Sequence, residues 1–173
     1  MAGSTCSCRI SGRLQRRVEA LIFIGIQGAG KTTFYDERFA NTHTRISLDA
    51  LRSRSRERAM LQRCLNTGQR FVVDNTSVRA ADRAVYITAA KAAGFRVIGY
   101  FFEIGLRQAL GRNARRSGKE LVPVPAVAGT LKRLERPSPL EGFDELYVVS
   151  PGENGSFLVS PWPLEPACEQ TSG

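Results

Sequence analysis

A glycine-rich segment that ends in lysine and threonine is the part of this chain whose residue types and spacing most directly indicate chemistry. Residues 25–32 read GIQGAGKT, which has the G-x-x-x-x-G-K-[ST] spacing of a phosphate-binding loop. The glycines let successive backbone N–H groups point at phosphate oxygens, and the next helix adds partial positive charge at its N-terminus. Lys31 would contact the β- and γ-phosphates, and the Thr32 hydroxyl would bind Mg²⁺. The segment therefore predicts a site for ATP.

The sequence on both sides of this loop supports the same interpretation. Residues 20–24 form an apolar, β-branched run that is typical of a buried strand, and residues 33–39 can continue as a helix. Strand, glycine-rich turn and helix is the context in which the motif binds phosphate. The alternative is a glycine-rich turn without a ligand, and the lysine, the threonine and both flanks argue against it. The residues expected to bind the nucleotide are Gly25, Gln27, Gly28, Ala29, Gly30, Lys31, Thr32 and Thr33.

Two aspartates follow predicted strands of the same sheet. Asp49 follows the strand predicted at 44–48, and Asp74 ends the strand predicted at 70–74. The carboxyl ends of strands in an open α/β sheet face the ligand crevice. A carboxylate opposite Thr32 suits Mg²⁺ or its water shell, so Thr32 and Asp74 are the predicted metal ligands. Asp74 could instead belong to a helix-capping turn, and the two roles are compatible.

Arginines are expected on both sides of the bound phosphates. Arg112 and Arg116 are four residues apart in a helix predicted at 106–116, which would place them on one helical face. With the loop at 117–124 they would form a lid that stabilises the charge of the transferred phosphate and excludes water. The alternative is an ordinary basic helix C-terminus. Arg52, three residues after Asp49, is close enough to share the site of that aspartate.

The remaining hydrophobic pattern alternates strands with helices, which predicts an α/β fold. His43 is expected to be a surface residue at a strand entrance, and Cys64 a small core residue. Trp162 would cover an apolar edge. Strands are expected at 20–24, 44–48, 70–74, 96–102 and 145–149, with a hairpin loop at 151–155 and a returning strand at 156–159. Helices are expected at 33–39, 49–67, 80–93, 106–116 and 125–135.

The size and charge of the chain indicate how many domains it can form and what kind of partner it suits. The chain has 173 residues, of which 42% are hydrophobic, so it fits one domain with a substantial core. Lys and Arg number 25 against 16 Asp and Glu, which gives a net charge of +9. This balance suits an anionic partner larger than ATP, although a basic surface can also serve solubility alone.

The sequence contains no apolar run near the ~20 residues that span a bilayer, and no block typical of a secretory signal. Four irregularly placed cysteines, Cys6, Cys8, Cys64 and Cys168, are expected to be reduced thiols. Cys6-x-Cys8 could ligate a metal, but no second pair lies nearby. The expected location is the cytoplasm, or the nucleus in a eukaryote.

Together these segments resemble the kinase domain of the polynucleotide 5′-hydroxyl kinases. The resemblance extends over residues 21–149. It depends on residues 25–32, Asp49 with Arg52, residues 74–76, residues 112–116, Val122-Pro123 and residues 139–145.

The resemblance implies a role for each matching position. Asp49 would be the general base that activates the 5′-hydroxyl, and Arg52 would contact the 3′ phosphate of the substrate. Arg112 and Arg116 would hold the donor phosphates from the lid, beside Lys31. ATP and Mg²⁺ would be the cofactors, and the 5′-hydroxyl end of DNA or RNA would be the acceptor in end healing or repair.

The implied fold is that of the P-loop kinases. It has a five-stranded parallel sheet in the order 2-3-1-4-5, flanked by helices, with a small C-terminal β-hairpin. A basic flexible arm is expected at 1–17, the kinase domain at 18–164 with its lid near 112–124, and a disordered tail at 165–173.

Two other functions are compatible with the same residues. The first is a kinase for a small hydroxylated metabolite or nucleoside, which would not require the charge of +9. The second is a nucleotide-dependent nucleic-acid-binding switch without transfer activity, which would not require a base such as Asp49.

Overall fold

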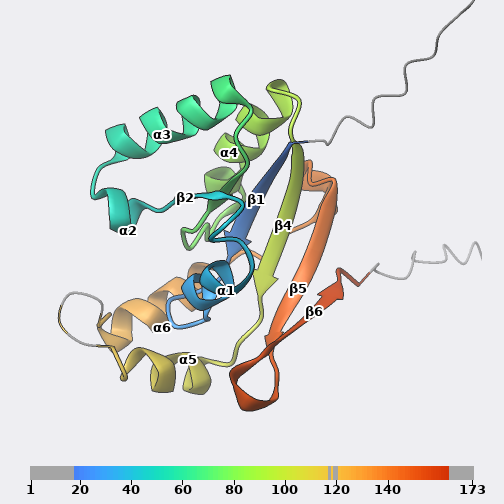
Figure 1. Ribbon diagram of the computed structural model, residues 1–173. Helices are drawn as coiled ribbons and strands as arrows, with labels where there is room; N and C mark the ends of the chain where they lie inside the picture. The colour runs from blue at the N-terminus through green and yellow to red at the C-terminus, as the bar shows by residue number, and fades with distance from the viewer. Residues whose placement is uncertain (1–17, 117, 119–120, 164–173) are drawn as a thin grey trace, which may run out of the picture.

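The apolar strands of the chain pair into one sheet of six strands in the order β2-β3-β1-β4-β5-β6 (Figure 1). The computed structural model describes residues 18–116, 118 and 121–163. The strands are β1 (Glu19–Ile24), β2 (Thr44–Ile46), β3 (Phe71–Val73), β4 (Arg96–Phe102), β5 (Glu145–Pro151) and β6 (Phe157–Pro161). The first five are parallel and follow the predicted order 2-3-1-4-5, which is therefore confirmed.

The predicted number of strands is wrong, because the sheet has six and not five. The returning segment of the expected C-terminal hairpin pairs antiparallel with β5 along its whole length, from Pro151 opposite Phe157 to Tyr147 opposite Pro161. The hairpin is thus an extension of the main sheet. Trp162 follows it and packs edge-on against Phe101, with ring centroids 5.7 Å apart, as expected for a residue that covers an apolar edge.

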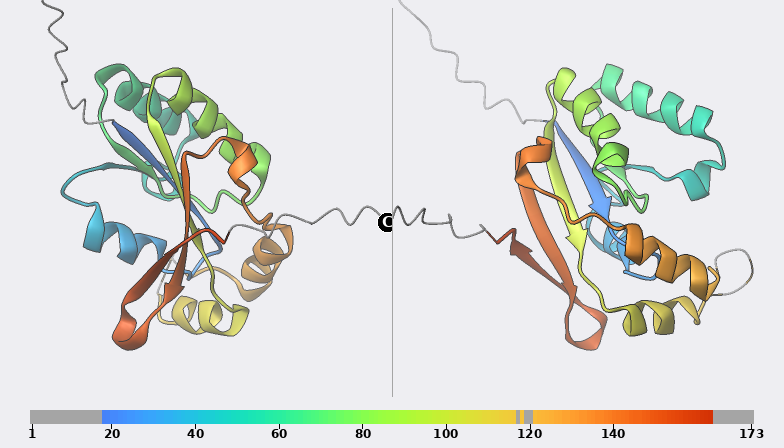
Figure 2. Two further views of the ribbon diagram at one scale, coloured as in Figure 1. Left: turned by 90° about the vertical axis from the view of Figure 1, so that its right-hand side faces the viewer. Right: turned by 180° about the vertical axis from the view of Figure 1, so that it is seen from behind.

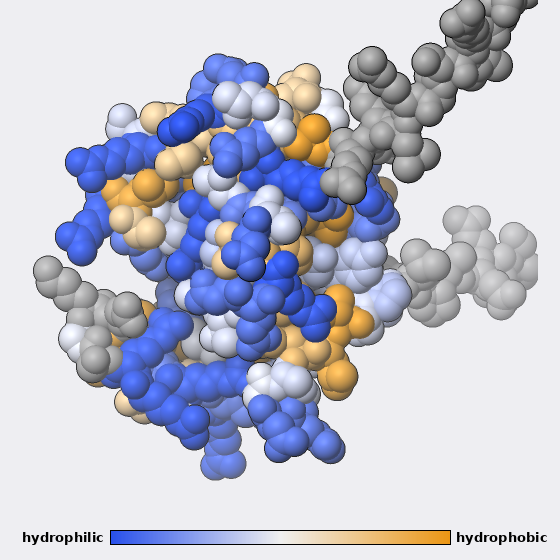
Figure 3. Space-filling view, in the orientation of Figure 1, coloured by the Kyte–Doolittle hydropathy of each residue, from blue (hydrophilic) through white to orange (hydrophobic). Residues whose placement is uncertain are grey.

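Helices cover both faces of the sheet (Figure 2). They are α1 (Lys31–Arg38), α2 (Leu48–Leu51), α3 (Arg54–Thr67), α4 (Ala80–Ala92), α5 (Leu106–Asn113) and α6 (Val124–Arg133), with short 3₁₀ turns η2 (Pro139–Glu141) and η3 (Glu153–Gly155). None of the helices in these described ranges is both long and apolar enough to cross a membrane. The face seen in Figure 3 is mainly hydrophilic, with hydrophobic residues in small separate areas.

Alternate residues of β1 point to opposite faces and fill two hydrophobic cores. Ile22 and Ile24 pack with residues of α3 and α4, whereas Leu21 and Phe23 pack with residues of α1, α5 and α6. Because both faces are covered, the central parallel strand is apolar throughout instead of alternating with polar residues. Phe34 of α1 fixes that helix through ring contacts with Phe23, Phe102 and Phe157, at centroid distances of 5.8, 5.4 and 5.2 Å.

The region after β2 differs from its prediction. The strand ends at Ile46 instead of Leu48, since Leu48 begins α2 and its N–H donates to Asn75 Oδ1 at 2.9 Å. The single helix expected at 49–67 is two helices, α2 and α3. They are separated at Arg52, whose φ of 55° lies in the left-handed region, and at Ser53.

The predictions for Cys64 and His43 have opposite outcomes. Cys64 is fully buried, which confirms the prediction of a core residue. His43 was expected at the surface, and this is wrong. Its side chain is buried beside Phe39, with Nε2 3.5 Å from a Glu19 carboxylate oxygen, and burial lowers the pKa of the imidazole. The arm at 1–17, with Cys6 and Cys8, and the tail at 165–173, with Cys168, lie outside the described residues.

A buried arginine anchors the loop between β3 and α4. Arg83 is completely buried and donates two hydrogen bonds of 2.6 Å to the carboxylate of Glu141. Its remaining nitrogen donates to the carbonyl oxygens of Ser77, Val78 and Glu135 at 3.0 to 3.3 Å. Ser77 has a φ of 46°, which is uncommon for a residue with a side chain. Arg83 therefore joins this loop to the segment before β5.

Candidate active site

The phosphate-binding loop turns directly from β1 into α1. Gly28 has a φ of 79°, and a Cβ at this position would lie 2.4 Å from the carbonyl oxygen of Ala109 in α5. Gly30 has a φ of 96°, and a Cβ there would lie 2.9 Å from the Phe157 ring. Both the backbone conformation and the close neighbours therefore require glycine. The loop is also bound to the segment after β3, because Gly25 N donates to Thr76 O at 3.1 Å.

Lys31 lies across the mouth of this loop. Its Nζ donates hydrogen bonds of 2.8 Å to the carbonyl oxygens of Gly25 and Ile26, and its side chain is buried. Burial is the main cause that lowers the pKa of Lys31 to about 8. The negative charges of Asp74 and Asp49 oppose this shift, and the positive charge of Arg116 adds to it. These charges act on Lys31 because all four side chains lie at one site. A bound phosphate would replace the two carbonyl contacts with a stronger anionic partner.

Thr32 and Asp74, the predicted metal ligands, lie opposite each other with 3.4 Å between Thr32 Oγ1 and Asp74 Oδ2. Arg45 of β2 joins them. Its Nε and Nη2 donate to Asp74 Oδ2 at 2.8 and 2.5 Å, and Nη2 also donates to Thr32 Oγ1 at 3.0 Å. The guanidinium lies 5.6 Å from the centre of the Tyr35 ring, which supports its position.

The two oxygen ligands have the chemistry that Mg²⁺ prefers, so the residues fit the predicted ion. Among the described residues, no group of three or more His, Cys, Asp or Glu side chains could hold a metal ion. The ion would therefore depend on phosphate and water oxygens for most of its ligands. Arg45 would have to release at least one of its two partners.

Asp49 lines the same cavity as the phosphate-binding loop. This cavity has a volume of about 70 Å³, and Lys31, Asp74 and Arg116 also line it. Asp49 lies in the first turn of α2, whose first N–H is bound by Asn75 Oδ1. The short helix therefore has a fixed position relative to β3, and it places Asp49, an exposed residue, in the wall of the cavity.

Arg112 and Arg116 approach the loop in a different way from the prediction. They do not share a helical face, because α5 ends at Asn113. The Asn113 side chain donates to Val122 O at 2.7 Å and accepts from Val122 N at 3.2 Å, which turns the chain back. Arg116 lies beyond this turn and lines the phosphate cavity. Arg112 lies over the loop, with Nη1 3.5 Å from Ala29 O.

Some residues expected at the site are not part of the cavity wall. Arg52 and Thr33 are exposed and do not line it, and Gly25 contributes only through its backbone. Four residues of the cavity wall were not among the predicted site residues. They are Arg45, Ser47, Asn75 and Thr76. Asn75 and Thr76 could have been predicted as site residues, because both directly follow Asp74, which ends a predicted strand.

The assembled groups match the needs of phosphoryl transfer. Backbone N–H groups and Lys31 can hold phosphate oxygens, and Arg112 and Arg116 can neutralise charge from the lid side. Asp49 supplies a carboxylate within the same cavity that can accept a proton. The geometry therefore contains both a phosphate cradle and a potential base.

Several solved structures, among them kinases, have the same architecture. A gluconokinase from Sinorhizobium meliloti 1021 matches with a TM-score of 0.55 and 18% identity, over 79% of this chain and 84% of that one. Kti12 from Chaetomium thermophilum, solved with ADP-AlF3, matches with a TM-score of 0.58 and 19% identity, over 76% and 88%. A sugar kinase from Janibacter sp. HTCC2649 matches with a TM-score of 0.57 and 17% identity, over 77% and 85%.

At these identities the structural similarity establishes the α/β P-loop kinase fold. The family model described as AAA domain matches residues 21–137, which include most of β1, the phosphate-binding loop, Asp49, Asp74, Arg112 and Arg116. Because this match covers well over half of the residues of the chain, the chain belongs to that AAA domain family.

Proposed function

We propose that this chain is an ATP-dependent phosphotransferase in which Asp49 is the general base. One observation carries the proposal: the Asp49 carboxylate lines the same small cavity as Lys31 and Arg116. A protein that only bound or hydrolysed a nucleotide as a switch would need no carboxylate on the acceptor side of its phosphate loop.

The reaction follows from this arrangement. The acceptor hydroxyl oxygen forms a bond to the γ-phosphorus of ATP, the bond from that phosphorus to the bridging oxygen breaks, and ADP leaves with the electron pair. Asp49 takes the hydroxyl proton late in the transfer. Lys31, Arg112 and Arg116 compensate the negative charge of the phosphates.

Thr32 and Asp74 would hold Mg²⁺, which, when bound, neutralises charge on the β- and γ-phosphates. Arg45 contributes a second positive charge at this position. In the structure it is paired with Asp74.

The 5′-hydroxyl of DNA or RNA is one candidate acceptor. It is supported by the resemblance to polynucleotide kinases and by the net charge of +9, because arginines bind phosphate backbones. A small hydroxylated molecule is the second candidate. It is supported by the fold shared with a gluconokinase and a sugar kinase and by a cavity of about 310 Å³ beside the site.

Transfer of labelled γ-phosphate tests the proposal. Wild-type protein with Mg²⁺ and labelled ATP should label a hydroxyl-bearing acceptor, and Asp49→Asn should reduce the transfer rate about 10²- to 10⁴-fold while ATP still binds. Asp36→Asn is the matched control, since Asp36 is an exposed aspartate on α1 that does not line the cavity. Equal transfer by wild type and Asp49→Asn would rule out Asp49 as the base, whereas ATP turnover without transfer to any acceptor would favour the switch.

A further inference from the structure

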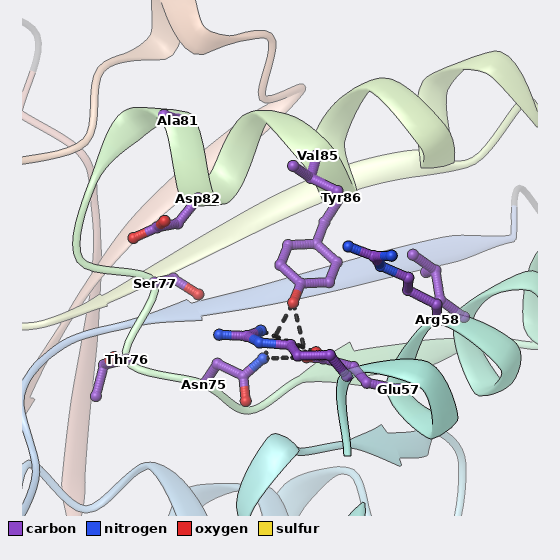
Figure 4. Close-up of a pocket in the computed structure, with 11 residues that line it drawn as sticks. Glu57, Arg58, Asn75, Thr76, Ser77, Ala81, Asp82, Val85 and Tyr86 are labelled. Atoms are coloured by element: carbon purple, nitrogen blue, oxygen red, sulfur yellow. Dashed lines mark hydrogen bonds and ion pairs between the residues drawn. The ribbon is translucent and has the colours of Figure 1, made fainter.

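A second cavity lies beside the phosphate site, between helices α3 and α4 (Figure 4). Its volume is about 310 Å³, several times that of the phosphate cavity. Asn75 and Thr76 line both cavities and therefore form the wall between them. A molecule in the second cavity would consequently lie next to the site where Asp49 and the γ-phosphate meet.

A hydrogen-bonded network gives this cavity a fixed polar floor. Glu57 Oε1 accepts from Tyr86 Oη at 2.7 Å and from Asn75 Nδ2 at 2.6 Å, and Glu57 Oε2 accepts from Arg54 Nη1 at 2.9 Å. Burial acts to raise the pKa of Glu57, but these three donors outweigh it and hold the pKa below its ordinary value. Burial and the Glu57 contact raise the pKa of Tyr86 to about 12. The network therefore keeps a buried carboxylate charged and uses its hydrogen-bonding capacity internally.

Two polar groups in the wall have no such partner. The Ser77 hydroxyl oxygen is buried, makes no hydrogen bond, and points toward the interior of the cavity in Figure 4. Arg58 of α3 makes no hydrogen bond or ion pair with another described residue. A buried hydroxyl without a partner is unfavourable, and a ligand hydroxyl would satisfy it.

The cavity wall carries two arginines and two carboxylates, so its attraction for an anion is local to Arg58. The positive charge of Arg54 is paired with Glu57, whereas that of Arg58 is free to bind a ligand. Asp82 lies at the edge, where its carboxylate accepts from the N–H of Arg79 at 3.1 Å and points away from Tyr86 in Figure 4. Leu61 and Val85 supply an apolar side, against which the carbon skeleton of a ligand can pack.

We infer that this cavity is the acceptor site and that it takes one small molecule carrying both a hydroxyl and an anionic group. This inference rests on the proposed phosphotransferase activity. The Arg58 guanidinium binds the carboxylate or phosphate of the acceptor, and Ser77 Oγ bonds one of its hydroxyls. A volume of about 310 Å³ fits a molecule of monosaccharide or mononucleotide size.

The test measures initial rates of label transfer from ATP to four probes. D-gluconate and a nucleoside 3′-monophosphate carry the required anion, D-glucose is the neutral counterpart of gluconate, and a 5′-hydroxyl DNA oligonucleotide represents a polymer. We expect transfer to at least one of the two small anions and much weaker transfer to glucose. A longer oligonucleotide should be no better than the mononucleotide. Faster transfer to gluconate would indicate that Arg58 binds a carboxylate, and faster transfer to the nucleoside 3′-monophosphate would indicate that it binds a phosphate.

Three variants separate this site from the donor site. Arg58→Ala should raise KM for the anionic acceptor about tenfold or more, without changing the affinity for ATP. Arg56→Ala is the matched control, because Arg56 is an exposed arginine two residues away on α3 that does not line the cavity. Ser77→Ala should also raise acceptor KM several-fold, yet should not lower the unfolding midpoint, because the hydroxyl has no partner within the protein.

Several results would overturn the inference. They are equal transfer to glucose and gluconate, transfer that requires a long oligonucleotide, equal effects of Arg58→Ala and Arg56→Ala, or ATP turnover with no transfer to either small anion. Failure of the protein to bind ATP would instead contradict the proposed activity, so the two failures can be distinguished.

Discussion

The phosphate cavity and the larger cavity beside it are assembled in different ways. Six of the 13 residues that line the phosphate cavity come from one continuous segment at 27–32, and the others come from several separate segments. The larger cavity has no such dominant segment, since its wall combines parts of α3, the loop after β3, and α4. A local motif therefore determines the donor chemistry, whereas the packing of two helices determines what lies beside it.

The two cavities also differ in the state of their polar groups. In the phosphate cavity, Lys31 and Arg45 have protein partners that a nucleotide and a metal ion would displace. In the larger cavity, Glu57 and Tyr86 are bound to each other, while Ser77 and Arg58 are available. The first site is thus closed by exchangeable contacts, and the second is already shaped for a ligand.

The largest expected effect comes from Arg83, which anchors the loop at Ser77 in the wall of the larger cavity. Arg83→Ala should lower the free energy of unfolding by about 3 to 5 kcal/mol, because it leaves Glu141 without its buried partner and frees the loop at Ser77. Urea denaturation measures the change. Lys91 lies on the same helix as Arg83, and Lys91→Ala, which breaks its exposed pair with Asp144, should cost less than about 1 kcal/mol. Equal costs would show that Arg83 does not anchor the wall.

An intermediate effect is expected from the floor of the larger cavity. Glu57→Gln should lower the free energy of unfolding by about 1 to 3 kcal/mol near neutral pH, because it weakens hydrogen bonds to a charged acceptor. The folded-state pKa of Glu57 lies below its ordinary value of 4.5, so this contribution is present above that pH. It is lost as the pH falls through the lower folded-state pKa.

Urea unfolding of wild type and Glu57→Gln, compared from about pH 6 to about pH 3, checks this prediction. The difference between the two proteins should shrink as the pH falls. A difference that stays constant would mean that the charge of Glu57 does not stabilise the floor.

The smallest effect is expected at the phosphate cavity. Arg45→Gln should strengthen the binding of Mn²⁺, used as a probe for Mg²⁺, by a few-fold in the absence of nucleotide. The reason is that the variant removes a positive charge hydrogen-bonded to both proposed ligands, Thr32 and Asp74. Electron paramagnetic resonance measures free Mn²⁺ directly. Arg63→Gln is the control, because Arg63 is an exposed arginine on α3. Unchanged or weaker Mn²⁺ binding by Arg45→Gln would contradict the prediction that Arg45 competes with the metal ion for Thr32 and Asp74.

Much of the fold could be predicted because the local pattern and the tertiary environment agree. β4 was expected at 96–102 and lies there, since its apolar run is bounded by Gly94 on one side and a loop on the other. The break between α2 and α3 could not be predicted, because Arg52 adopts a left-handed conformation within a pattern compatible with one helix. Arg116 was misplaced for a similar reason: the hydrogen bonds of Asn113 with Val122 end α5 early.

The site was predictable only where its residues are close in sequence or follow strand ends. Lys31, Thr32, Asp49 and Asp74 belong to such positions. Arg45 was missed because its partner Asp74 is 29 residues away and on a neighbouring strand. The larger cavity was missed entirely, since no periodicity indicates that two helices leave a space between them.

Steady-state kinetics with varied ATP and acceptor test the division between the two cavities most directly. The account predicts that Asp49→Asn lowers kcat about 10²-fold or more with little change in either KM, while Arg58→Ala raises acceptor KM about tenfold and leaves kcat nearly unchanged. If both variants change the same parameter, or if neither differs from wild type, the two cavities do not have the separate donor and acceptor roles assigned to them.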